Sequence, residues 1–138
     1  MREFELIDHF FAEGTARRED VILGIGDDAA LLRVPARQRV VTAITTVRDI
    51  PREESPESLG RRALRLSLDR LSDLGATPAW ATLALTMPEA DEDWLARFSA
   101  ALKGLAKRFD VCLVGGDTTR GPLMITIICN GFVAVSDP

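Results

Sequence analysis

Two long stretches of the chain repeat apolar residues at the three- and four-residue spacing that places them on one face of a helix. The first stretch runs from Glu57 to Leu74, and either Ser55 or Pro56 can begin it. The second runs from Asp91 to Arg108. A shorter repeat from Glu3 to Glu13 predicts an amphipathic helix near the N-terminus.

Between these stretches lie runs of valine, isoleucine, leucine and threonine, which predict strands. In chain order the predicted strands are Val21–Ile25, Leu31–Val34, Arg39–Val47, Trp80–Met87, Val111–Val114 and Leu123–Val135. Thr77 and Pro78 are expected to interrupt the chain before the fourth strand. Gly115–Pro122 is expected to be a polar, glycine-rich turn before the last strand.

If Leu31–Val34 is counted as a resumption of the strand at Val21–Ile25, the predicted order of elements is helix, two strands, helix, strand, helix and two strands. Helices and strands intermix without strict alternation, so the pattern favours an α/β or α+β fold with a mixed sheet. No internal repeat and no linker-like segment divides the sequence. Residues 1–138 are therefore predicted to form a single domain.

Composition narrows the class of protein. Of the 138 residues, 46% are hydrophobic and 28% are charged, which is typical of a globular protein, and the net charge of −4 argues against a nucleic-acid partner. No apolar run is long enough to span a membrane, and the N-terminus lacks the order of a signal peptide, so we expect a cytoplasmic protein. Without a secretion signal, Cys112 and Cys129 are expected to be free thiols.

Two acidic, glycine-containing segments follow apolar strands and carry the candidate chemistry. In the first, Gly24–Ala29, Asp27 and Asp28 are adjacent. Adjacent carboxylates repel each other unless a cation lies between them, and their oxygens suit Mg²⁺, so this segment is a candidate metal site. The alternative is an ordinary turn, because aspartate also favours turns through bonds to its own backbone.

The second segment, Gly115–Gly121, combines a carboxylate with hydroxyls and a cation. Gly116 precedes Asp117, and Thr118 and Arg120 follow it. Successive backbone N–H groups in such a glycine-rich turn can bind phosphate, with Asp117 holding a metal ion beside it. The segment is not a Walker A loop, because no lysine follows its last glycine. The residues alone lead to a divalent-metal and phosphate site on a mixed sheet.

These motifs resemble those of thiamine-monophosphate kinases. Leu23–Leu32 (LGIGDDAALL) and Val114–Pro122 (VGGDTTRGP) match the two acidic motifs of that family, and Trp80–Met87 resembles its central strand. The resemblance covers essentially the whole chain. It implies the N-terminal domain of the aminoimidazole ribonucleotide synthase-like fold, with helices packed on one face of the strands and the C-terminal domain of the family absent.

The resemblance also implies an activity, namely transfer of the ATP γ-phosphoryl group to thiamine monophosphate with Mg²⁺ bound. On this basis Asp27, Asp28 and Asp117 are expected to hold metal and Gly116 to contact the nucleotide. Arg120 is expected either to stabilise phosphate charge or to pair with an aspartate. A homodimer formed through the strands around Arg39–Val47 and Trp80–Met87 is also expected.

Three positions depart from the pattern of this family. By the resemblance, Ile44 and Arg70 occupy positions of metal-binding aspartates, and Pro51 lies where a substrate-contacting histidine is usual. Isoleucine cannot bind Mg²⁺, and arginine replaces a cation's charge without its geometry. Two hypotheses therefore stand. One is a divergent kinase, and the other is a non-catalytic, dimerising homologue or fragment that retains a vestigial nucleotide site.

Overall fold

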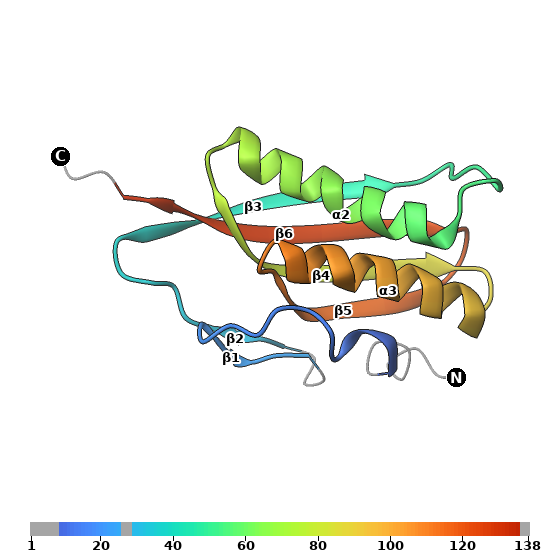
Figure 1. Cartoon of the computed structure of the whole chain (residues 1–138), viewed down its shortest axis with the longest axis horizontal. Coiled ribbons are helices and arrows are strands. Elements are labelled where there is room, and N and C mark those ends of the chain that lie inside the picture. Colours follow the sequence, from blue (N-terminus) through green and yellow to red (C-terminus); the bar gives the residue numbers. More distant parts are fainter. Residues whose placement is uncertain (1–8, 26–28, 136–138) are drawn as a thin grey trace.

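The computed structural model describes residues 9–25 and 29–135 of the chain. Asp27 and Asp28 lie outside the described residues. Figure 1 shows a layer of two helices against a four-stranded sheet, with a small hairpin beside the sheet. The elements are β1 (Val21–Leu23), β2 (Leu31–Leu32), β3 (Gln38–Val47), α2 (Pro56–Asp73), β4 (Thr77–Met87), α3 (Glu92–Arg108), β5 (Cys112–Arg120) and β6 (Met124–Ala134).

Both long helices are confirmed within two residues of their predicted ends. The Oγ atom of Ser55 accepts a hydrogen bond from the backbone N–H of Ser58 at 3.1 Å and so caps α2. Asp91 caps α3 in the same way by accepting from the N–H of Trp94 at 3.1 Å. These bonds satisfy N–H groups that have no partner within the helix, which is why the sequence marks the helix starts so clearly.

The four-stranded sheet has the order β3-β6-β4-β5 and is mixed, as predicted. β6 is antiparallel to both of its neighbours, whereas β4 and β5 are parallel and are joined through α3. Helices α2 and α3 cover one face of the sheet (Figure 1). The main core lies between the helices and the sheet, where Leu64, Phe98 and Ile127 are among the fully buried side chains.

The prediction of a turn over Gly115–Pro122 is wrong for most of that segment. Strand β5 continues to Arg120, and its residues from Gly115 onward pair in parallel register with Thr82–Met87 of β4. Glycine, aspartate and threonine read as turn residues locally, but pairing along the whole length of β4 holds their backbone extended. The chain turns only after Arg120.

Strand β4 also begins earlier than predicted, at Thr77, so the expected interruption at Thr77 and Pro78 is wrong. Pro78 has no N–H to donate, and the pairing of β4 with β6 is irregular between Pro78 and Trp80. Proline is tolerated at the start of a strand next to such an irregularity. Of the predicted N-terminal helix, the structure describes residues 9–13, and His9–Phe11 are helical.

The face of the sheet away from the helices is the open face. The β1–β2 hairpin covers one end of it, where Val21 and Leu32 pack against a second apolar cluster that contains Trp80 and Phe132. The rest of the face is exposed or half-buried. None of the helices in the described part of the chain is long and apolar enough to cross a membrane.

Candidate functional site

Asp117 lies on the open face. It pairs in register with Ala84, while its neighbour Thr119 is hydrogen-bonded to Thr86, with 2.9 Å between the two hydroxyl oxygens. The side chain of Asp117 is exposed. Its carboxylate is therefore available to a ligand from the open side of the sheet.

The other candidate site residues of Gly115–Gly121 do not all lie on the open face of the sheet. Side chains alternate along a strand, so Thr118 faces the helices, where it is 2% exposed. Its hydroxyl cannot contact a ligand that is bound at Asp117. Arg120 also alternates away from Asp117 and is exposed at the end of β5. Gly116 is exposed, so its backbone is accessible. The structure thus places the side chains of Asp117 and Thr118, which are adjacent in the sequence, on opposite faces of the sheet.

Hydrogen-bonded polar side chains also lie on the open face across β3 and β6. The hydroxyls of Thr46 and Thr126 are hydrogen-bonded across β3 and β6 with 2.9 Å between their oxygens. The amide of Asn130 donates to Thr42 Oγ1 at 2.9 Å. Since these groups satisfy one another, they form an ordered polar surface with Asp117 at one edge of the sheet.

No group of three or more histidine, cysteine, aspartate or glutamate side chains is placed to hold a metal ion among the described residues. Asp117 is the candidate metal ligand that the structure describes. Asp27 and Asp28 belong to the segment that links β1 and β2. Strand β1 contacts β5, the edge strand that contains Asp117.

The three residues that depart from the family pattern lie in different parts of the fold. Ile44 is 66% exposed on the open face of β3, at the opposite edge of the sheet from Asp117. Three strand spacings separate these edges, or about 14 Å. Arg70 lies in the last turn of α2, in the helix layer, and Pro51 is exposed in the loop before α2. Ile44 and Arg70 are therefore on opposite sides of the sheet.

One polar contact beneath α2 was missed in the sequence. Thr45 follows Ile44 and faces the helices, where its hydroxyl is hydrogen-bonded to that of Ser67. Ser67 is completely buried, and its hydroxyl also donates to the backbone oxygen of Ile127 at 3.3 Å. The only sequence signal was a serine on the apolar face of a predicted helix. This contact joins α2 to β3 and β6.

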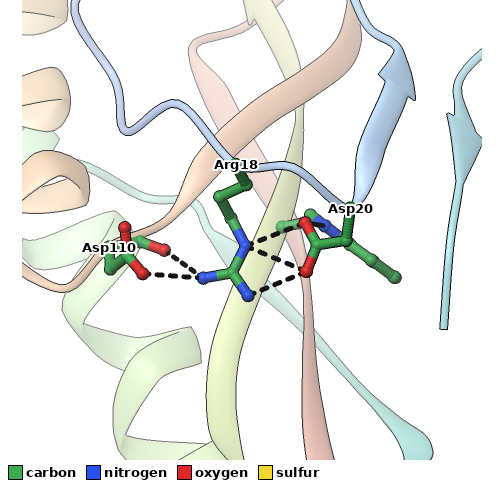
Figure 2. A network of polar contacts seen from close by, with 4 residues as sticks. Arg18, Asp20 and Asp110 are labelled. Atoms are coloured by element: carbon green, nitrogen blue, oxygen red, sulfur yellow. Dashed lines mark hydrogen bonds and ion pairs between the residues drawn. The ribbon is translucent and has the colours of Figure 1, made fainter. Parts of the chain in front are cut away.

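A second polar network anchors the hairpin. Arg18 lies between Asp20 and Asp110 (Figure 2). Its Nε donates to Asp20 Oδ1 at 3.0 Å and its Nη2 to Asp20 Oδ2 at 2.9 Å. Its Nη1 donates to the backbone oxygen and to Oδ2 of Asp110, at 2.8 Å and 3.0 Å. The indole N–H of Trp80 donates to Asp20 Oδ1 at 2.9 Å.

Arg18 and Asp20 each shift the pKa of the other. Burial alone would raise the pKa of Asp20, but hydrogen bonds from Arg18 and Trp80 outweigh burial and hold that pKa below its ordinary value. The hydrogen bond to Asp20 raises the pKa of Arg18. Asp20 is therefore ionised at neutral pH and binds Arg18 as an ion pair.

Comparison with known proteins begins with the sequence. Residues 26–133 match the family model described as AIR synthase related protein, N-terminal domain. The chain is 45% identical over 135 residues to thiamine-monophosphate kinase of Escherichia coli (strain K12), an alignment that covers 95% of this chain and 41% of the relative. The chain thus spans about two-fifths of the length of the curated relatives it matches.

Solved structures show the same fold. The crystal structure of thiamine-monophosphate kinase from Stenotrophomonas maltophilia K279a matches with a TM-score of 0.83 and 43% identity, over 94% of this chain and 42% of that one. The structure of AaThiL complexed with AMPPCP and TMP matches with a TM-score of 0.69. At 19% identity over 74% of this chain and 35% of that one, the second match supports the fold alone.

Proposed function

Because the chain belongs to the AIR synthase related protein family, as an N-terminal domain, we propose that it provides the nucleotide- and Mg²⁺-binding part of a thiamine-monophosphate kinase. The observation that carries this proposal is the 45% identity to such a kinase over nearly the whole chain. AaThiL, a protein with this fold, was solved with AMPPCP and TMP, and the ligands that we propose for this chain are accordingly ATP and thiamine monophosphate.

The proposed reaction transfers the γ-phosphoryl group of ATP. A phosphate oxygen of thiamine monophosphate bonds to the γ-phosphorus, and the bond from that phosphorus to the β–γ bridging oxygen breaks, giving thiamine diphosphate and ADP. The acceptor is already an anion, so the obstacle is repulsion between two polyphosphates rather than removal of a proton. Bound Mg²⁺ would neutralise and align these groups.

The residues of this chain have corresponding roles. Asp27, Asp28 and Asp117 would hold Mg²⁺, and a donor set made only of carboxylate oxygens suits this hard cation. The exposed backbone at Gly116 would contact the nucleotide. Since the Thr118 hydroxyl faces the helices, its part would be limited to its backbone. Arg120 would either stabilise phosphate charge or pair with an aspartate.

Titration of ATP by calorimetry, with Mg²⁺ and with EDTA, tests the site. Asp117→Asn removes a ligand charge without changing its size and is expected to abolish most of the Mg²⁺-dependent gain in affinity. Asp69→Asn, at an exposed position on α2, is the control and should leave that gain unchanged. A folded wild-type chain whose ATP affinity does not depend on Mg²⁺ would refute the proposal.

The second candidate is a non-catalytic homologue that binds nucleotide and dimerises. Ile44, Arg70 and Pro51 favour it, because by the resemblance they stand where the family has metal or substrate residues. A dimer would form through the open face or the free edge of β3, since β4 is paired on both sides. Sedimentation at high concentration tests for the dimer. Formation of thiamine diphosphate from thiamine monophosphate separates the kinase from the binding protein.

A further inference from the structure

Small residues lie beside Asp117 on the open face. Ala84, its partner across the β4–β5 pairing, is exposed, and Gly115 precedes Asp117 by two positions on the same strand. Neither neighbour has a side chain larger than a methyl group. A ligand bound at Asp117 can therefore lie close to the surface of the sheet, where it meets the next side chains along β4 and β5.

The next residues on this face of β4 and β5 are Thr86 and Thr119, which pair in register. Thr119 follows Asp117 by two residues, so its side chain lies on the same face, about 7 Å along the strand. Thr119 is exposed and Thr86 is half-buried. Their hydroxyl oxygens are 2.9 Å apart. Strand β5 thus presents a carboxylate and a hydrogen-bonded hydroxyl to the same side of the sheet.

Gly121 fixes the orientation of Thr86. A Cβ atom at Gly121 would lie 2.9 Å from Thr86 Cγ2, which is shorter than a van der Waals contact between carbon atoms. The methyl group of Thr86 therefore packs directly on the backbone of Gly121. The N–H of Gly121 donates to the backbone oxygen of Met87 at 3.1 Å and keeps this backbone in place. Because a β-branched side chain has few rotamers, Thr86 is a rigid partner for the Thr119 hydroxyl.

The Thr86–Thr119 pair can bind one more group. Each hydroxyl has one O–H donor and two acceptor lone pairs, and either hydroxyl can donate within the pair. When Thr86 donates, the O–H of Thr119 is free to donate to an oxygen in front of the sheet. An ionised Asp117 only accepts hydrogen bonds, so it binds a phosphate only through a cation. Thr119 supplies the donor that Asp117 lacks.

We propose that Thr119 donates a hydrogen bond to a phosphate oxygen of the nucleotide, and that Thr86 is a positioning residue that orients the Thr119 hydroxyl. Asp117 would hold the Mg²⁺ that binds the same phosphates. This role rests on the proposed function, because it concerns the same nucleotide site.

The test is calorimetric titration of ATP, with Mg²⁺ and with EDTA. Thr119→Val replaces the hydroxyl by a methyl group of similar size, and valine suits a strand. Loss of a hydrogen bond to a charged phosphate should weaken the affinity for ATP about tenfold. Because the contact does not pass through the metal, the loss should be equal in Mg²⁺ and in EDTA. Asp117→Asn should instead weaken binding mainly in Mg²⁺.

Thr86→Val tests the positioning role. Without its partner, the Thr119 side chain can distribute over three staggered rotamers, so the affinity for ATP should fall about threefold. Thr86→Ser and Thr119→Ser each keep the hydroxyl and remove a methyl group. Both serine variants should bind ATP as the wild type does, whereas a role in packing alone would make them as weak as the valine variants or weaker.

A matched control lies at the other edge of the same face. Thr46 and Thr126 also form a hydroxyl pair with 2.9 Å between their oxygens. Thr46 is exposed on β3, three strand spacings from β5, or about 14 Å. Thr46→Val removes an equivalent hydrogen bond and should leave the affinity for ATP unchanged in both buffers.

The outcomes separate this role from the proposed function. If the wild type shows Mg²⁺-dependent binding and Thr119→Val binds ATP as tightly as Thr46→Val, the role of Thr119 is overturned while the proposed function stands. If Thr119→Val loses affinity and Thr86→Val does not, the positioning role of Thr86 is overturned. If the affinity of the wild type does not depend on Mg²⁺, the proposed function fails and the role of Thr119 with it.

Discussion

The crossing of α2 and α3 offers a sharp test of the packing. Gly60 faces α3 so closely that a Cβ atom at this position would lie 2.6 Å from the backbone oxygen of Phe98 and 3.3 Å from the N of Leu102. Real Cβ atoms do not approach an oxygen so closely, and a backbone oxygen within a helix cannot rotate away. We therefore expect Gly60→Ala to push the two helices apart by about 0.8 Å at this point.

The magnitude follows from two opposing effects. Overpacking of a buried site costs about 1–3 kcal/mol, and a clash with backbone belongs near the upper end of that range. Replacing glycine by alanine within a helix stabilises by about 1 kcal/mol. The net expectation for Gly60→Ala is a free energy of unfolding lower by about 2 kcal/mol, or a melting temperature lower by about 8 °C for a chain of this size.

Gly104 of α3 is the control, because a Cβ atom there would meet nothing within 4 Å. Gly104→Ala receives the helix-propensity gain without the clash and should raise the melting temperature by about 4 °C. Urea and thermal unfolding, followed by circular dichroism, measure both variants. If Gly60→Ala is as stable as Gly104→Ala, the close approach of the two helices is wrong.

Three further predictions concern buried polar groups and thiols. Burial would raise the pKa of Asp20, but hydrogen bonds from Arg18 and Trp80 hold it below its ordinary value of 3.8. The ionised carboxylate therefore stabilises the folded protein fully above pH 3.8. This stabilisation is lost as the pH falls through the lower pKa of the folded state. The stability gap between wild type and Asp20→Asn should therefore close in acid unfolding curves, and a gap that widens there would contradict this. Burial raises the pKa of Cys129 to about 12, so iodoacetamide should modify Cys112 first, and mass spectrometry showing equal rates in the folded protein would count against this burial. Ser67→Ala should lower the free energy of unfolding by about 1 kcal/mol, because it leaves the Thr45 hydroxyl without this partner. Adding Thr45→Val should recover part of that loss in urea unfolding. If the effects of the two substitutions on the free energy of unfolding are strictly additive, the contact is wrong.

Local sequence determined the helices because their signals lie within a few residues of one another. The spacing of apolar residues in α2 and α3, and the caps at Ser55 and Asp91, act through bonds between near neighbours. The mixed sheet also followed from the order of strands and helices. The family could be identified from the two acidic motifs, since their residues are contiguous.

The tertiary structure decided those features that depend on contacts between residues far apart in the sequence. The residues from Gly115 to Arg120 have the local character of a turn, and they are a strand because β4 lies alongside them. That pairing places Asp117 on the open face and Thr118 against the helices, a separation that spacing alone does not reveal.

The network at Asp20 could not be predicted from the sequence either. It joins residues that lie 60 and 92 positions apart along the chain. Hydrogen bonds form only within about 3 Å, and the topology of the whole sheet determines which distant side chains come that close. The sequence thus determined the elements and the acidic motifs, whereas the fold determined which of their side chains can act together.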